Sequence, residues 1–317
     1  MIIDAHTHVF NKKISGFPPE AETRYFRNAE TSGDWLVTSM NAAGVDKAFL
    51  IGYNNSDISR CISIMGTEPR CFENVVSAEY AVSVFKKYPG RFYLFLDSID
   101  PDKGNCKEIF FRNLELGATG MKLMPGFCST YIDDERFSDI YDHSEKNGIP
   151  IIADTSFWYI NEDSFPLKEP GGKNFKDHLD HISSVAKAFP GLRIQIAHYG
   201  TPEDHADMIL NKNYKTYMAF IDLMVKHDNL FTDTAALPFH YDKTYRYRAM
   251  SEFIKFLCDE IGSHRVMYGT DWPYFCNGIY LTYRQGVDLI RECELFDDKQ
   301  KADLLGGTAQ RFLGDRA

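Results

Sequence analysis

The sequence lacks long apolar runs and a recognisable secretion signal. A membrane-spanning helix needs about 20 consecutive apolar residues, and no run in the 317 residues approaches that length. The start does not pair a basic segment with an apolar stretch, because Asp4 and His6 interrupt it at once. No secretion signal is therefore expected, and the sequence favours a cytoplasmic protein that does not act at a membrane.

Closely spaced cysteine pairs and a positive charge excess are also missing. The seven cysteines are odd in number and form no CxxC pair, which predicts reduced thiols rather than a disulfide framework. The formal net charge is −10, which argues against the phosphate backbone of a nucleic acid as a partner. We therefore expect a small-molecule substrate and no nucleic-acid partner.

What the sequence does contain is a set of short apolar runs, each followed by turn residues. Such runs are too short for buried helices and are typical of buried strands. They are eight in number: Ile2–His8, Asp46–Gly52, Arg91–Asp97, Ala118–Met124, Ile149–Thr155, Arg193–His198, Asn229–Ala235 and Arg265–Asp271.

Helical patterns occupy many of the intervals between these runs. Asp34–Ala43, for example, has apolar residues at helical spacing and stops at Gly44, which can supply the left-handed residue that ends a helix. Four further intervals have the same character: Asn74–Lys87, Phe137–Lys146, Asp180–Phe189 and Tyr247–Ile261.

Regular alternation of strand and helix predicts parallel strands with right-handed crossovers. Eight units favour a closed (β/α)8 TIM barrel over an open doubly wound sheet, and residues 1–317 fit one such domain. Three intervals, 9–33, 53–73 and 156–178, are longer than a plain barrel needs. Each follows a strand, so we expect extended loops on the C-terminal face, where barrel enzymes form their active sites.

A pair of histidines ends the first predicted strand. Residues two apart on a strand point to the same face, so His6 and His8 are expected to project together. Two imidazoles on one face provide half of a typical zinc coordination shell. A histidine pair of this spacing frequently binds nothing, so its position at a strand end is what favours a metal site.

Titratable side chains end most of the other predicted strands. A charge at the end of an apolar strand is costly to bury unless it is paired or bound to a metal. A functional site at one rim is the first interpretation, and ion pairing between neighbouring strand ends is the alternative. The residues are Lys122, Asp154, His198, Asp233 and Asp271.

Several motifs, in their order along the chain, make the sequence resemble the amidohydrolase superfamily, in particular the amidohydrolase-2 group. That group includes amino-carboxymuconate semialdehyde decarboxylases, resorcylate decarboxylases and lactone hydrolases. The resemblance covers nearly the whole chain, and its order and spacing are more specific than any one motif. The motifs are DAHTH at 4–8, GVDK at 44–47, KKYPGRF at 86–92, GMKL at 120–123, AHYG at 197–200, GTDWP at 269–273 and LGGTA at 305–309, the last similar to the family's closing helix.

The resemblance implies a role for most of the strand-end residues. It makes His6 and His8 metal ligands, and Asp271 a ligand that also accepts a proton from water or substrate. His198 resembles the histidine that hydrogen-bonds the nucleophile or polarises the substrate. Asp233 fits a structural carboxylate better than a catalytic one.

Asp154 departs from the family pattern, because the fifth strand of these proteins usually ends in a histidine that completes the metal shell. A carboxylate can bind Zn²⁺ but shifts the preference toward harder ions such as Mn²⁺. We expect one divalent ion, with zinc favoured, manganese second and Asp154 as a ligand, and we expect no nucleotide cofactor. A metal-free site, as in some lactonases of the group, stays open.

Lys122 allows three interpretations. A carbamylated lysine bridging two metals would need histidines on both the fifth and sixth strands, and only His198 is present, so a single-metal site is favoured. A free ammonium group could bind a substrate carboxylate or stabilise an oxyanion. It could equally form a salt bridge with Asp154 or Asp97.

Aromatic side chains crowd the segments after the strands, as small-molecule pockets often require. A flat or aromatic substrate is one interpretation, and packing beneath long loops is the other. We name four candidate substrate-binding residues: Phe127, Trp158, Tyr199 and Trp272.

The leading functional hypothesis is hydrolysis of a small amide, ester or lactone by an activated water, with catalytic roles for Asp271, His198 and Lys122. The first alternative is non-oxidative decarboxylation of an aromatic or dienoic acid at the same metal site, since fold resemblance does not separate the two. A barrel that binds its ligand without turnover is a further alternative, and an interaction scaffold has little support. Barrels of this kind often form homodimers through their outer helices, and the sequence does not assign a face.

Overall fold

The computed structural model describes most of the chain, with gaps. The described residues are 1–10, 31–52, 78–97, 104–125, 130–154, 175–200, 208–209, 211–215, 217–237, 247–273, 276 and 281–317. Most of the three long intervals predicted on the C-terminal face lie outside them. Within the described ranges, no helix combines the length and apolar character needed to cross a bilayer.

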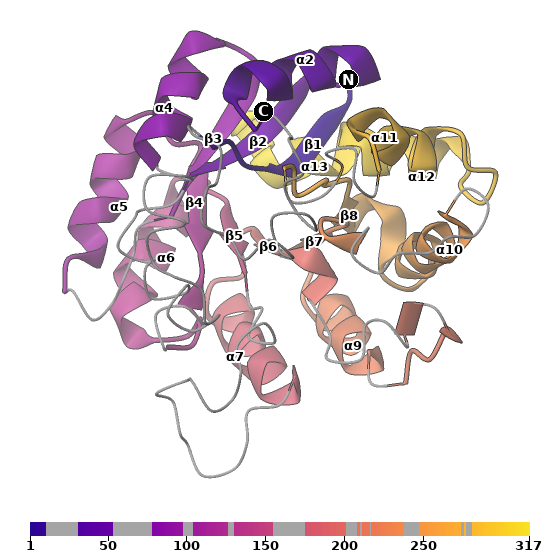
Figure 1. The fold of residues 1–317 in the computed structure, drawn as a ribbon. Helices are drawn as coiled ribbons and strands as arrows, with labels where there is room; N and C mark the ends of the chain where they lie inside the picture. The colour runs from indigo at the N-terminus through magenta and orange to yellow at the C-terminus, as the bar shows by residue number, and fades with distance from the viewer. Residues whose placement is uncertain are drawn as a thin grey trace, which may run out of the picture.

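Eight parallel strands follow one another in chain order and form a nearly closed barrel with helices outside it (Figure 1). Each strand lies within one of the eight predicted runs, so the predicted (β/α)8 architecture is confirmed. The strands are β1 (Ile3–Thr7), β2 (Lys47–Gly52), β3 (Phe92–Leu96), β4 (Gly120–Leu123), β5 (Ile151–Ala153), β6 (Ile194–Ile196), β7 (Leu230–Asp233) and β8 (Val266–Met267).

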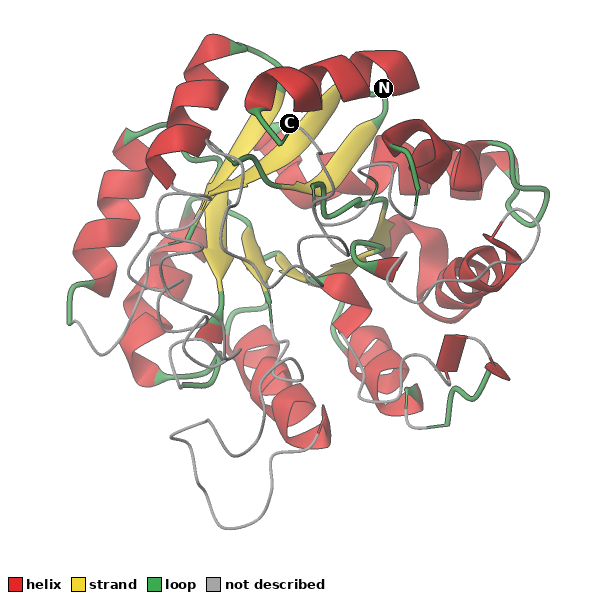
Figure 2. Ribbon diagram, in the orientation of Figure 1, coloured by secondary structure: helices red, strands yellow, loops and turns green. Residues whose placement is uncertain are grey.

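Helices surround this sheet (Figure 2), and the predicted end of the first one is confirmed, because Gly44 has a left-handed φ of 75°. The α-helices among the described residues are α2 (Gly33–Ala43), α4 (Ala78–Lys87), α5 (Cys106–Glu115), α6 (Ser138–Lys146), α7 (Phe175–Ala188), α9 (Met218–Lys226), α10 (Arg248–Leu257), α11 (Tyr283–Arg291), α12 (Asp298–Ala302) and α13 (Thr308–Leu313). The predicted start of α7 at Asp180 is five residues late.

The last α-helix, α13, packs apolar side chains into the interior core of the barrel. The ring of Phe312 is fully buried and lies 5.9 Å from that of Phe49, 6.3 Å from Phe95 and 5.4 Å from Phe231, measured between ring centroids. Arg193 fixes the helix by donating from Nε to the carbonyl oxygen of Phe312 at 2.6 Å. The predicted closing segment 305–309 therefore covers only the start of this helix.

Replacing Phe312 by Ala should lower the free energy of unfolding by about 3–5 kcal/mol, because it leaves a cavity among three other aromatic rings. Urea denaturation monitored by circular dichroism measures the change. Gln310→Ala is the matched control, since Gln310 is exposed on the same helix and should change stability little. Equal stability of the two variants would contradict the role of α13 as an interior plug.

A local irregularity in β1 sets which side chains enter the barrel. Asp4 pairs with Ala48 and Thr7 pairs with Leu50, so three steps along β1 match two along β2. An extra residue in one strand changes the face to which the following side chains point. Ala5 lies in the interior core, and His6, the next residue, also faces inward, where it contacts β7.

Candidate metal centre

The Nε2 atoms of His6 and His8 both face the carboxylate of Asp271. His6 Nδ1 lies 3.1 Å from Asp233 Oδ2, and His8 Nδ1 lies 3.2 Å from the carbonyl oxygen of Ile51. Both partners accept hydrogen bonds, so each Nδ1 carries the proton and each Nε2 keeps its lone pair when the ring is neutral. The two Nε2 atoms lie 3.8 and 3.2 Å from Asp271 Oδ1.

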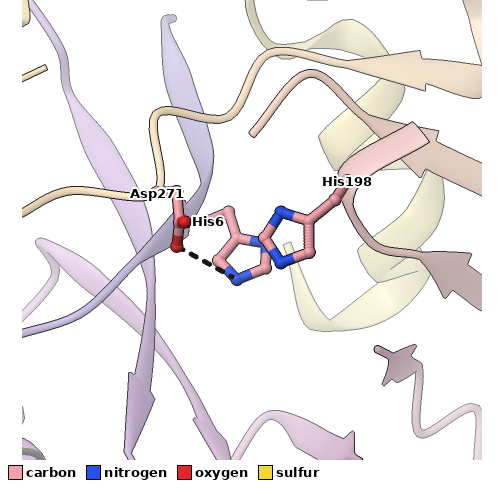
Figure 3. Close-up of side chains that lie close together, drawn as sticks. All are labelled: His6, His198 and Asp271. Carbon is pink, nitrogen blue, oxygen red and sulfur yellow. Dashed lines mark ion pairs between the residues drawn. The ribbon is translucent and has the colours of Figure 1, made fainter. Parts of the chain in front are cut away.

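His198 joins His6 and Asp271 in a compact group (Figure 3). One potential ligand atom from each of the three residues lies within 4.8 Å of the others. His198 and Asp271 both have left-handed backbone conformations, with φ of 55° at each. Non-glycine residues adopt this conformation at a cost, and such residues concentrate at functional sites.

Asp233 is the carboxylate around which this group is organised. It is fully buried and accepts hydrogen bonds at Oδ1 from the backbone N–H of His198 and of Ala235, both at 2.9 Å. At Oδ2 it accepts from His6 Nδ1 and from Gln195 Nε2. An acceptor that fixes the tautomer of a ligating histidine is a recurrent partner in metal sites, which agrees with the structural role expected for this residue.

Lys122, Asp154 and His198 form a second set of contacts beside the group. Asp154 Oδ2 lies 3.4 Å from Lys122 Nζ and 3.3 Å from His198 Nε2. The salt bridge between Lys122 and Asp154, one of the three interpretations of the lysine, is thus present in the structure. Asp154 is not part of the three-residue group described above.

Burial and charge set the protonation of the histidines differently. Burial, followed by the charge of Lys122, lowers the pKa of His6 to about 4, and burial also lowers the pKa of His8. Burial opposes the charged form of His198 too, yet the carboxylates of Asp154, Asp271 and Asp233 outweigh it and raise its pKa to about 9. At neutral pH the metal-free site therefore holds two neutral imidazoles and one imidazolium.

The same balance keeps the carboxylates ionised. Burial raises the pKa of Asp233, but the charge and hydrogen bond of His6, followed by those of His198, hold it at about 2. Burial likewise opposes ionisation of Asp271, and the contact with His8, followed by the charge of His198, lowers its pKa overall. Asp271 is thus an anion that faces three imidazole rings.

The four candidate substrate-binding aromatics fall into two groups. Phe127 and Trp158 lie outside the described residues. Tyr199 and Trp272 are both 1 % exposed and belong to the hydrophobic core, where the Tyr199 ring lies 5.4 Å from that of Phe253. The structure places these two rings in packing positions beside the site.

Two features of this centre were not expected from the sequence. His198 was expected to hydrogen-bond the nucleophile or polarise the substrate, whereas the structure also places one of its ring nitrogens in a compact group with ligand atoms of His6 and Asp271. Gln195 donates a hydrogen bond to Asp233 Oδ2, the same oxygen that His6 contacts. The sequence indicates this role only through its position, two residues before the inward-facing Ala197.

Nearly the whole chain matches one family model, described as amidohydrolase, over residues 3–314. The chain therefore belongs to the amidohydrolase family and is an enzyme. This confirms the resemblance inferred from the motifs. A search of curated proteins found no match.

Solved structures of the same fold include proteins with different activities. An amidohydrolase from Burkholderia multivorans with bound zinc superposes with a TM-score of 0.65 at 15% identity over 99% of both chains. A probable 2-pyrone-4,6-dicarboxylic acid hydrolase from Acinetobacter baumannii gives 0.62 at 13% over 99% of both chains. A 2,6-dihydroxybenzoate decarboxylase in complex with 2,6-dihydroxybenzoate gives 0.64 at 16% over 98% of both chains. Identities this low show a shared fold.

Proposed function

We propose that this protein is a metal-dependent hydrolase of a small amide, ester or lactone, with one divalent ion at the centre formed by His6, His8, His198 and Asp271. The observation that carries the proposal is the Nε2 atom of His6. It is buried and has no hydrogen-bond partner among the described residues, although the opposite ring nitrogen is held by Asp233. A buried polar atom without a partner requires an explanation, and a cation would satisfy this one.

The donor set fits such an ion. Two neutral imidazoles and a carboxylate match the nitrogen and oxygen ligands of catalytic zinc sites, which keep one position for water or substrate. His6, His8 and Asp271 would hold the ion, with Asp154 as the candidate fourth ligand and His198 beside them as a hydrogen-bond donor. When bound, the ion supplies Lewis-acid polarisation of a substrate oxygen and a lower pKa of water.

The remaining steps belong to the protein's own side chains. Asp271 accepts the proton of the attacking water and later returns it to the leaving group. His198, held as a cation by Asp154, donates a hydrogen bond to the oxyanion that develops on the substrate. Lys122 adds positive charge on the same side, 3.4 Å from Asp154, and we assign it to stabilisation of the same oxyanion.

Non-oxidative decarboxylation of an aromatic or dienoic acid is the second candidate. The observation that favours it is the cationic state of His198, because a proton on this ring could be delivered to the carbon from which CO2 leaves. The decarboxylase of the same fold lends support at the level of the fold alone. A metal-free lactonase would use Lys122, His198 and Asp271 and would leave His6 Nε2 without a partner.

Metal analysis tests the proposal first. We expect purified wild-type protein to contain, or take up, about one Zn²⁺ or Mn²⁺ per chain, and His6→Ala to lose it. Asp303→Ala is the control, since Asp303 is another buried carboxylate that contacts Ser263, Lys299 and Arg311. Asp154→Ala then shows whether that carboxylate is the fourth ligand. Wild-type protein that takes up no divalent ion would contradict the proposal.

A further inference from the structure

Asp4 lies two residues before His6, one of the proposed ligands of the metal ion, and has no role in the chemistry described above. It is fully buried, and its side chain points out of the barrel toward α11. We propose that Asp4 is a positioning residue that holds β8 against β1 and thereby sets the separation of His6 and Asp271. This inference deepens the proposed metal site and rests on it.

The seam between β8 and β1 is where the barrel closes, and it has little regular pairing. Strands β1 to β8 pair in sequence, whereas the pairing across the seam is one isolated bridge, between Thr7 of β1 and Trp272 in the segment after β8. Three backbone hydrogen bonds cross the seam, donated by the N–H groups of Ala5, His8 and Asp271 at 2.8, 2.6 and 2.9 Å. His6 and Asp271 lie on opposite sides of this seam.

Asp4 adds four hydrogen bonds that connect both sides. Oδ1 accepts the backbone N–H of His6 at 3.1 Å and that of Thr270 at 3.0 Å. Oδ2 accepts the hydroxyl of Thr270 at 2.6 Å and that of Tyr283, on α11, at 2.6 Å. One carboxylate therefore fixes the backbone of one ligand and of the residue directly before another.

The position of Asp4 relative to the β1 irregularity strengthens the inference. The extra residue lies between Asp4 and Thr7, so the orientation of His6 depends on a segment outside the regular ladder. Asp4 Oδ1 binds the N–H of that segment. The carboxylate thus holds the backbone conformation that turns His6 into the barrel, in addition to closing the seam.

The test uses the affinity for Co²⁺, which reports on the geometry of the ligands through its visible absorption. Asp4→Ala should raise the dissociation constant about 10–100-fold, the range found when residues that orient ligands are removed. Asp4→Asn should recover most of that loss, because its amide oxygen can accept both backbone N–H groups. Asp303→Ala, which removes a buried carboxylate that does not contact the site, should leave the constant unchanged.

Hydrogen exchange separates this inference from the metal proposal. In Asp4→Ala, the amides of Ala5, His8 and Asp271 should exchange faster than in wild type, while in Asp303→Ala they should not.

Should Asp4→Ala fail to fold, Thr270→Val, which removes one contact to Oδ2, should show both effects to a smaller degree. Wild-type protein that binds no Co²⁺ would contradict the metal site, and exchange alone would then decide the role of Asp4. Unchanged Co²⁺ affinity or unchanged seam exchange in Asp4→Ala, or in Thr270→Val where Asp4→Ala does not fold, would overturn it.

Discussion

Asp271→Asn should lower kcat about 10²–10⁴-fold, because the amide cannot accept the proton that the carboxylate takes in the proposed mechanism. Asparagine is the informative replacement at this position. The backbone of Asp271 has a φ of 55°, and asparagine tolerates the left-handed conformation better than most residues. The variant is therefore expected to keep the local fold while losing the charge.

The measurement is steady-state turnover of a substrate found by screening lactones, esters, amides and aromatic acids, at saturating metal. Metal content and the urea midpoint are recorded for the same preparations, so that loss of the ion or of the fold is seen separately. Asp303→Asn is the matched control, since it neutralises a buried carboxylate outside the site and should retain wild-type kcat. A metal-loaded, folded Asp271→Asn protein with wild-type kcat would contradict the assignment of Asp271 as the base.

The sequence predicted the strands and the rim better than the helices. Strand ends with titratable residues converge in any closed parallel barrel, so Lys122, Asp154, His198, Asp233 and Asp271 could be grouped from their positions alone. The predicted helices were those with a stop signal, as at Gly44, but α5 was missed although Gly117 follows it, and α11 and α12 were missed as well. Helix α9 was not identified either, since Tyr217 provides no side-chain cap at its start and no glycine follows its end at His227.

The details of the centre depend on contacts that no pattern specifies. The alternation of strand residues places Asp4, His6 and His8 on one face, yet the β1 irregularity sends Asp4 toward α11 and the histidines into the barrel. Likewise, sequence offered Lys122 both a substrate role and a salt bridge with Asp154. The structure shows the salt bridge, and a lysine in this position can serve both functions.

Lys122→Met separates these two functions and should have the second large effect. Lys122 is fully buried and Asp154 is 10 % exposed. Removing Lys122 leaves this buried carboxylate in contact with the cationic His198, at 3.3 Å, and the loss of one cation should lower the free energy of unfolding by up to about 3–5 kcal/mol, the cost of breaking a buried pair. If Lys122 also stabilises the oxyanion, kcat should fall about 10²–10³-fold, the loss found when one such donor is removed. Urea denaturation and steady-state turnover measure the two effects on the same protein.

The double variant Lys122→Met with Asp154→Asn decides between them, because residues in direct contact must be tested as a cycle. Neutralising Asp154 removes the carboxylate charge that Lys122 helped to compensate, so the free energy of unfolding should recover in the double variant relative to Lys122→Met. Turnover should stay low, because the positive charge near the substrate oxygen is still missing. Asp154→Asn alone provides the fourth corner of the cycle. Recovery of kcat together with stability would show that Lys122 serves only to neutralise Asp154, and His198 would then be the remaining oxyanion donor.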